Sequence, residues 1–383
     1  MLTLRPAEGL TDGAGASRLD RGDEHRSCLY LFNDDSSLLS AVRMDALLRP
    51  YGVWGQFALS GDAQRMGLSE RQIENYLGRE PDFIAPVSSF MSSAMLSQFD
   101  YVHSAKFPKA FRDFLRAYEW SGFRRRPCFV STFPGLELLP NEGLPARSVA
   151  DILCFNNFAD LEAGRERLGA ARRNSPPPVE ILRFNPLLLT ARNSPPEPRI
   201  VRTLVFFVQS ALPASRAGRQ DVADLLRQIT VANPACRVLV KLRHLRGEDR
   251  YHTHREYVSF QSLLAGAGPR VECVDISMER ALRCADAVLT CSSTAGLQAL
   301  AHGVPAMFYD SYPDHEHESQ WPGVQRLLKA SNLIVSREQA VRLDTPRADP
   351  RWFQENLSTS ADLARLISAM RRGLRLVQAD CAA

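Results

Sequence analysis

Short apolar runs alternate with amphipathic stretches along most of this 383-residue chain. The first run, CLYLFN, has the apolar content of a buried strand, and the stretch that follows opens on helix-capping residues and closes on Pro and Gly. Further strands are expected at GQFALS, DFIAPV, DYVHSA, PCFVSTF and ADILCFN, and helices over residues 69–78, 107–120 and 157–171. This alternation predicts a doubly wound parallel sheet.

Proline interrupts this rhythm between residues 172 and 198. The segment holds NSPPP and NSPPEP around one apolar stretch, and proline at that density blocks both helix and sheet hydrogen bonds. Strands are then expected at TLVFFVQS, RVLVKLR, RVECVD, DAVLTC and PAMFYD, with helices over 219–232, 255–265, 277–284 and 293–302. We expect a flexible extension at residues 1–26, a first domain at 27–171 and a Pro-rich connector with one strand at 172–198. A second domain at 199–350 and a C-terminal helix at 351–383 are expected to follow.

Composition narrows the class of protein. The chain is 45% hydrophobic and 23% charged, with a net charge of +4, which is typical of a globular protein and too weakly basic for a dedicated nucleic-acid binder. Its eight cysteines form no C-x-x-C pair and lie largely in apolar runs, so we expect buried thiols in a reducing compartment. No apolar run approaches the ~18 residues of a membrane span. We expect a cytoplasmic protein, with weak peripheral contact at the inner membrane face as an alternative.

The segment TCSSTAGLQALAHGVP places small hydroxyl residues between a predicted strand and a predicted helix. Ser292, Ser293 and Thr294 lie at the helix start, where backbone N–H groups and the helix dipole bind anions, phosphate above all. The alternative is that one serine simply caps the helix. Gln209 ends another predicted strand, where it could line the same edge of the sheet or only terminate the strand.

A second segment, KLRHLRGEDRYHTHREY, gathers ionisable residues after a strand. Lys241 and Arg243 are two residues apart and therefore leave the strand on one side. Glu248, Thr253 and His254 follow in the next loop. Lysine and arginine supply positive charge for a phosphate, and a histidine can protonate a leaving oxygen near neutral pH. The alternative is a charged surface loop.

Candidate bases lie in the N-terminal half. Asp34 and Asp35 end the first predicted strand, where a carboxylate could deprotonate an acceptor hydroxyl or cap the next helix. His103 lies late in another strand and could be a base or a core histidine. Glu137 belongs to a Gly- and Pro-containing loop, STFPGLELLPNEG, that could face an acceptor. The run DHEHES has no distant partner at a recognised ligand spacing, so we expect no metal there.

These motifs resemble an uncharacterised bacterial family of predicted glycosyltransferases. The resemblance covers roughly residues 29–370 and is most specific in the ordered pair K-x-R…G-E…T-H-x-E-Y and S-S-T-A. More distantly, both motifs are similar to parts of GT-B capsule enzymes that transfer Kdo or sialic acid from CMP-sugars. The resemblance implies two Rossmann-like domains facing a central cleft, with a C-terminal helix crossing back to the first domain. It also implies a nucleotide-sugar donor in the second domain and a glycan or glycolipid acceptor in the first.

The resemblance assigns roles to individual residues. The implied ligands of the donor phosphate come from the strand exit, its loop and the helix start: Lys241, Arg243, His254, Ser292, Ser293 and Thr294. Gln298 stands where relatives tend to carry a glutamate that grips the ribose. Asp34, Asp35 or His103 would deprotonate the acceptor, and no metal or cofactor is expected.

Two other functions remain open on the same fold. One is a nucleotide-sugar epimerase or a glycerophosphate-type transferase, which changes the chemistry and keeps the nucleotide site. The other is a non-catalytic scaffold that binds a glycan or a partner protein, which the uncharged Gln298 favours.

Overall fold

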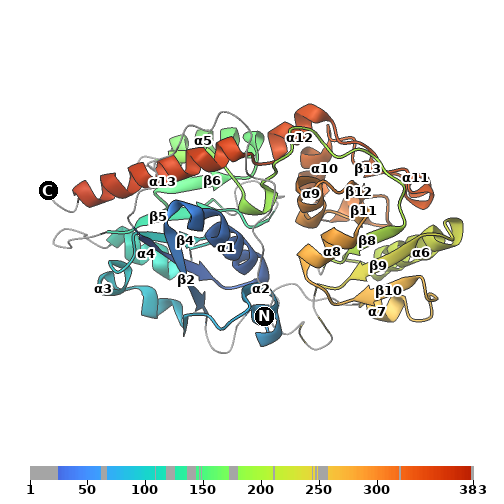
Figure 1. Ribbon diagram of the computed structural model, residues 1–383, viewed down its shortest axis with the longest axis horizontal. Helices are drawn as coiled ribbons and strands as arrows, with labels where there is room; N and C mark the ends of the chain where they lie inside the picture. The colour runs from blue at the N-terminus through green and yellow to red at the C-terminus, as the bar shows by residue number, and fades with distance from the viewer. Residues whose placement is uncertain are drawn as a thin grey trace.

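The chain forms two α/β domains that lie side by side (Figure 1). The computed structural model describes residues 25–61, 67–107, 109–117, 126–135, 144–145, 147, 149–171, 180–209, 212–243, 245, 248, 258–318 and 321–380. Each domain is built on one parallel sheet with helices on both faces, as the alternating pattern predicts.

The first sheet has seven strands in the order β3-β2-β1-β4-β5-β6-β7, and every pairing is parallel. Its central strands β4 and β5 are buried along their whole length, as expected when helices cover both faces of a parallel sheet. The strands are β1 (Arg26–Phe32), β2 (Val53–Ser60), β3 (Phe83–Ala85), β4 (Tyr101–Ser104), β5 (Cys128–Thr132), β6 (Ile152–Phe155) and β7 (Glu180–Arg183).

Two helices close one face of the first sheet. Leu38 and Met44 of α1 (Asp35–Leu48) share one apolar core with Leu366 and Met370 of α13 (Ser360–Asp380). At Gly373 of α13 a Cβ atom would lie 2.9 Å from the Cys128 sulfur, so glycine permits close contact between helix and sheet. The remaining helices of this domain are η1 (Arg49–Tyr51), α2 (Glu70–Leu77), η2 (Val87–Phe90), α3 (Ser93–Leu96), α4 (Lys109–Ala117) and α5 (Phe158–Ala171).

The second sheet has six strands in the order β10-β9-β8-β11-β12-β13, the strand order of a dinucleotide-binding domain. Separate apolar cores line its two faces. The strands are β8 (Thr203–Phe207), β9 (Arg237–Lys241), β10 (Val271–Val274), β11 (Ala287–Thr290), β12 (Ala306–Tyr309) and β13 (Ile334–Val335). The helices are α6 (Arg216–Ala232), α7 (Phe260–Leu263), α8 (Met278–Cys284), α9 (Thr294–Ala301), η6 (His315–His317), α10 (Trp321–Leu328), α11 (Arg337–Arg342) and α12 (Pro350–Asn356).

The C-terminal helix crosses back onto the first domain. After α12 in the second domain, α13 packs against β5, β6 and β7 of the first sheet (Figure 1). A buried ion pair joins Arg183, at the end of β7, to Asp362 in the first turn of α13. Arg183 also donates to the carbonyl oxygen of Gln354 in α12, at 2.5 Å. The predicted fold, two Rossmann-like domains with a crossover helix, is confirmed.

The predicted strands are confirmed, and the elements missed are short or lie late in the chain. Strand β7 is the one strand predicted in the Pro-rich connector, and it forms the edge of the first sheet, next to β6. The pattern did not predict α10, α11 or the two-residue strand β13. Of the helix predicted over residues 255–265, the described part is helical only at Phe260–Leu263.

The proposed base His103 lies in the core of the first domain. Its side chain is 2% exposed, and Nε2 is 2.9 Å from the Thr132 hydroxyl oxygen, which lies 3.3 Å from that of Ser40. Burial lowers the pKa of His103 to about 3, so the ring is neutral at physiological pH. A buried neutral imidazole has no access to an acceptor, and His103 is therefore a core histidine rather than the predicted base.

The buried His103 predicts an acid-sensitive fold. Because its pKa is about 3 in the folded chain and 6.5 in the unfolded chain, only the unfolded chain takes up the proton between these values. Its contribution to stability is complete above pH 6.5 and falls as the pH drops towards 3. At pH 4.5 the loss is about 3 kcal/mol. Urea unfolding should show a shallower pH dependence for His103→Gln than for the wild type, while the exposed His317→Gln variant keeps the wild-type slope.

Candidate active site at the domain boundary

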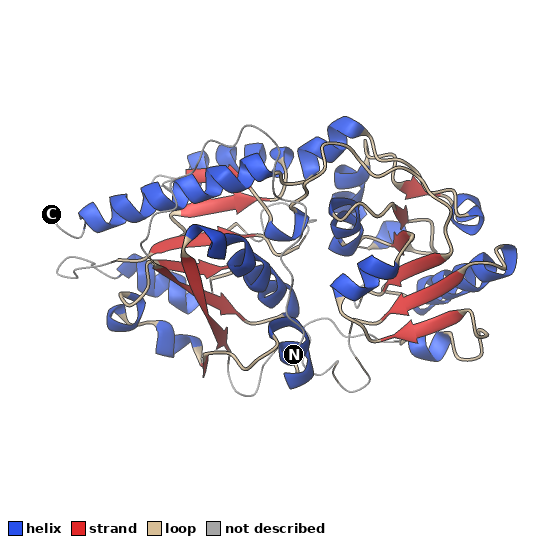
Figure 2. Cartoon of the chain, in the orientation of Figure 1, coloured by secondary structure: helices blue, strands red, loops and turns tan. Residues whose placement is uncertain are grey.

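The carboxyl ends of both sheets point towards the other domain, as the arrowheads in Figure 2 show. In the second sheet the strand order reverses between β8 and β11, so the chain leaves these neighbouring strands in opposite directions. In doubly wound sheets this point is the usual place for a ligand. The residues directly after β8, β9, β10 and β11 therefore share one edge of the sheet.

Gln209 and Ser292 form a clamp across that reversal point. The Ser292 backbone N–H donates to Gln209 Oε1 at 2.8 Å, and Gln209 Nε2 donates to the Ser292 hydroxyl at 3.1 Å. Ser293 is the N-cap of α9, and its hydroxyl accepts from the Ala295 N–H at 3.1 Å. The prediction that a serine caps this helix is thus confirmed, and the clamp fixes the helix start at the carboxyl edge of the sheet.

Helix α9 approaches the sheet closely. At Gly296 a Cβ atom would lie 2.4 Å from the Phe308 ring, so a larger residue there would displace the helix. Gln298 lies one turn beyond Thr294 on the same side of α9, and its side chain is 6% exposed. Thr294 and Gln298 therefore lie one above the other on the same side of α9, close to its start.

A loop of the first domain reaches the start of α9. At Gly135 a Cβ atom would lie 3.4 Å from the Thr294 hydroxyl oxygen. Buried Asn185 holds this loop by donating to the Phe133 carbonyl at 3.0 Å and to Asn156 at 2.7 Å, and Asn156 donates to the Gly135 carbonyl at 2.6 Å. The described part of the predicted acceptor-facing loop therefore lies against the predicted phosphate-binding helix.

Lys241 lies on the same edge of the sheet as the clamp. It pairs in register with Phe207, while Leu289 pairs with Phe206, so Lys241 is level with Thr290 two strands away. Strand spacing puts their backbones about 10 Å apart. The ammonium group is buried and donates to the Leu242 carbonyl at 3.0 Å. Burial lowers the pKa of Lys241 to about 8, although the nearby carboxylates of Asp275 and Asp35 oppose this shift.

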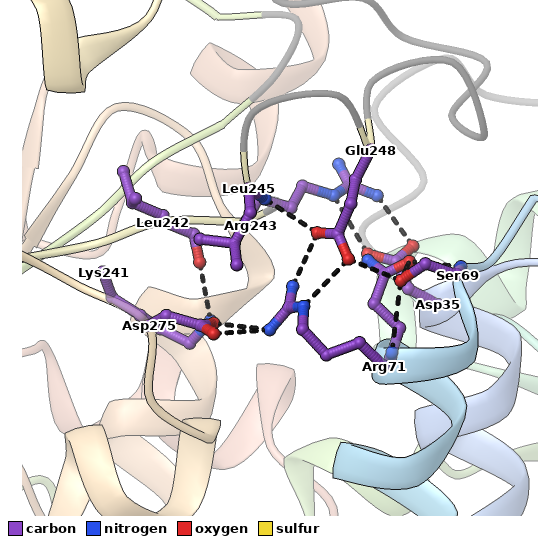
Figure 3. Close-up of polar contacts among 10 residues, drawn as sticks. Asp35, Ser69, Arg71, Lys241, Leu242, Arg243, Leu245, Glu248 and Asp275 are labelled. Carbon is purple, nitrogen blue, oxygen red and sulfur yellow. Dashed lines mark hydrogen bonds and ion pairs between the residues drawn. The ribbon is translucent and has the colours of Figure 1, made fainter.

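Arg243 contacts the first domain directly. Its Nε and Nη2 atoms donate to the two oxygens of Asp35 at 3.0 and 2.9 Å, which is a bidentate ion pair across the domain boundary (Figure 3). Asp35 is the first residue of α1 and is 7% exposed. Two predicted site residues from opposite halves of the chain therefore meet.

Arg71 of α2 makes a second link between the domains. It donates to both oxygens of Glu248, at 2.8 and 2.6 Å, and to both oxygens of Asp275, at 2.7 and 2.6 Å (Figure 3). Ser69 also donates to Glu248, at 2.6 Å. Burial alone would raise the pKa of Glu248, but the hydrogen bonds from Arg71 and Ser69 lower it to about 2. Glu248 is thus an ionised partner of the first domain, and its contact with a donor stays a prediction.

The other predicted site residues divide into two groups. Asp34 is the N-cap of α1 and accepts from the Ser37 N–H at 2.7 Å, so the capping interpretation is confirmed for this residue. Thr253, His254 and Glu137 lie outside the described residues.

Sequence analysis missed three residues of this region. Asp275 follows β10 directly, and the rule that polar residues after strands line the site would have found it. Arg71 gave no signal, because a charged residue on an amphipathic helix is typical of a solvated face. Arg219 also reads as a surface residue of a helix, yet it is 1% exposed and donates to the carbonyl oxygens of Pro213, Val258 and Gln209 at 2.9, 3.1 and 3.0 Å.

Within the described ranges, no three His, Cys, Asp or Glu side chains gather closely enough to hold a metal ion. None of the described helices combines the length and the apolar content that crossing a membrane requires.

Two facing Rossmann-like domains, with a helix start and cations at the reversal point of the second sheet, define a protein of the GT-B fold. The chain belongs to the family described as "Putative glycosyltransferase (DUF6716)", whose model matches residues 56–372. No curated protein matches its sequence.

Solved structures with the same fold include nucleotide-sugar enzymes. A putative UDP-N-acetylglucosamine 2-epimerase from Listeria monocytogenes has a TM-score of 0.56 at 12% identity, covering 91% of this chain and 96% of its own. MnaA from S. aureus with UDP gives 0.56 at 9% identity, covering 92% and 97%. UDP-GlcNAc 2-epimerase from Neisseria meningitidis bound to UDP-GlcNAc gives 0.53 at 9% identity, covering 90% and 100%. At these identities the likeness establishes the fold alone.

Removing the cation of Arg71 should weaken the contact between the domains. In Arg71→Met the carboxylates of Glu248 and Asp275 lose their shared partner, which should lower the free energy of unfolding by about 1–2 kcal/mol. Arg79→Met is the matched control, because Arg79 pairs with Asp82 inside the first domain. Urea unfolding at low and high salt measures both variants. An Arg71 variant no less stable than the Arg79 variant would contradict the linking role.

Proposed function

We propose that this protein is a glycosyltransferase that moves a sugar from a nucleotide-sugar donor, bound by the second domain, to a glycan or glycolipid acceptor bound by the first. The observation that carries the proposal is the clamped start of α9, which lies on the same sheet edge as Lys241 and Arg243. Membership of a family described as glycosyltransferases supports the reaction class.

The geometry suits stabilisation of a departing phosphate. Helix-start N–H groups and the cations of Lys241 and Arg243 are fixed before the reaction, and such preorganised charge is usually the largest catalytic contribution. These cations can neutralise the leaving group in the role that a divalent ion has in metal-dependent transferases, so we propose a metal-independent reaction. Asp35 is the carboxylate of the first domain that lies next to them and is the proposed base.

The identity of the donor nucleotide is a second, more specific part of this proposal. The sequence resemblance favours CMP-Kdo or a CMP-sialic acid, whereas structures of this fold hold UDP or UDP-GlcNAc. Gln298, buried one turn behind Thr294, is the proposed contact to the ribose, which it would bind without charge. UDP and CMP should therefore be tested side by side, with GDP and CDP in the same series.

A nucleotide-sugar epimerase is the second candidate. The three structures compared above, all with TM-scores above 0.5, are of two UDP-GlcNAc 2-epimerases and of a protein solved with UDP. Epimerisation needs no acceptor, so incubation with a nucleotide-sugar alone separates the two functions. An epimeric nucleotide-sugar in that reaction would favour the epimerase, while sugar transfer that requires an added glycan favours the transferase.

Replacing the clamp amide by a carboxylate should separate folding from donor binding. In Gln209→Glu the carboxylate can still accept from the Ser292 N–H and hydroxyl, so the melting temperature should stay within a few degrees of wild type. The added negative charge should lower nucleotide affinity at least tenfold, equivalent to about 1.4 kcal/mol. Thermal shift with each nucleotide measures both quantities, because a ligand of the folded state raises the melting temperature.

The matched control for the clamp is Gln220→Glu on the exposed side of α6, where Gln220 contacts Asp224. It adds the same charge away from the sheet edge and should leave nucleotide binding unchanged. If the wild type binds a nucleotide and Gln209→Glu binds it equally well, the site does not lie at the start of α9.

The pKa of Lys241 predicts a pH-dependent affinity for the nucleotide. With a pKa of about 8 in the free protein, Lys241 is charged below pH 8 and loses its proton above it. Affinity should therefore be constant from pH 6.5 to 7.5 and fall above pH 8, by up to about tenfold per unit. Lys241→Arg should bind with a flat profile, because arginine keeps its proton throughout this range. Calorimetry from pH 6.5 to 9.5 measures the nucleotide affinity of the wild type and of Lys241→Arg. If the affinity of both proteins depends on pH in the same way, Lys241 does not belong to the site.

A further inference from the structure

We infer that Asp35 occupies the phosphate-binding fork of Arg243 in the donor-free protein, so that donor binding releases this carboxylate to accept the acceptor's proton. The inference rests on the proposed function and adds an order of events to it. In this order of events the donor phosphate replaces Asp35 on the guanidinium group of Arg243, and the same replacement activates Asp35 as the base.

The geometry of the Arg243–Asp35 pair is that of a bound oxyanion. Nε and Nη2 of Arg243 each face one oxygen of the carboxylate, at 3.0 and 2.9 Å. The same planar fork binds two oxygens of a phosphate, so carboxylate and phosphate compete for it. Arg243 lies two residues after the end of β9, on the sheet edge that also carries Lys241 and the start of α9, so the inference places the phosphate between these groups and the fork.

The neighbouring carboxylates are committed to other partners. Glu248 and Asp275 both contact Arg71, and Asp34 caps α1. Asp35 accepts from the Ser36 N–H at 2.9 Å as well as from Arg243, so the start of its own helix continues to hold it when the guanidinium group changes partner. Asp35 is therefore the carboxylate placed to exchange.

Arg71 keeps the domains together during this exchange. Its bonds to Glu248 and Asp275 join α2 to the second domain without using Asp35 or Arg243. A donor that separates Asp35 from Arg243 therefore leaves a second interdomain link in place. The Asp35 carboxylate stays at the boundary, where an acceptor on the first domain would meet the donor sugar.

The transfer step balances once Arg243 has moved from Asp35 to the donor phosphate. The acceptor hydroxyl gives its proton to the Asp35 carboxylate, and its oxygen forms a bond to the anomeric carbon of the donor sugar. The bond from that carbon to the phosphate oxygen breaks, and its electron pair leaves with the nucleotide. Lys241, Arg243 and the N–H groups of α9 stabilise the negative charge on the leaving phosphate.

The test measures nucleotide binding and transfer separately in Asp35→Asn. Removing the competing charge should tighten binding of UDP or CMP about tenfold, because the fork no longer has to be vacated. Removing the base should lower kcat about 100-fold or more. Asp344→Asn is the matched control: it breaks an exposed aspartate–arginine pair with Arg342 in the second domain and should change neither quantity.

The possible outcomes of the Asp35→Asn test decide between the exchange and its alternatives. Tighter nucleotide binding with a lower kcat supports the exchange, and unchanged or weaker binding overturns it even if kcat falls. If the wild type and Asp35→Asn bind none of the nucleotides, the proposed function itself fails. Should Asp35→Asn not fold, Asp35→Ser gives the same comparison, because it removes the same charge and leaves the N-cap residue Asp34 in place. Initial-rate kinetics of the wild type should show the donor binding before the acceptor, and the reverse order would also overturn the exchange.

Discussion

The site depends on one constraint: both sheets are parallel and present their carboxyl ends to each other. In a parallel sheet every strand delivers its last residues, and every following helix its start, to the same edge. That geometry brings Gln209, Lys241 and Ser292 together although more than eighty residues separate the first from the last. The facing edge of the first sheet adds Asp35 and Gly135, which lies in the loop after β5.

The charges on the two edges are complementary, and they join the two domains through ion pairs. Arg243 and Asp35 neutralise each other across the boundary, and Arg71 does the same for Glu248 and Asp275. When one partner of such a partly buried ion pair is removed, the charge of the other is left uncompensated, which is unfavourable. The proposed exchange depends on this property, since a donor phosphate would offer Arg243 an alternative partner to Asp35.

Sequence patterns predicted the parts of the site that depend on strand ends and missed those that depend on domain docking. Lys241, Arg243 and Ser293 follow buried strands, so their placement follows from the alternation of apolar runs. Arg71 becomes part of the site only because α2 docks against the second domain, which no local pattern encodes. The sequence left two roles open for His103 for a related reason: its position in a strand gives its register, but its depth depends on α1 packing over it.

The partners of each cation distinguish structural from exchangeable charge. Arg219 is fully buried and donates to three backbone carbonyl oxygens, which belong to the chain itself and fix the segment after β8 relative to Val258. A phosphate cannot replace those acceptors without unfolding that segment. Arg243 instead faces a side-chain carboxylate that can rotate away. The difference in partner, rather than in charge or residue type, is the reason that Arg243 and not Arg219 is proposed to bind the donor phosphate.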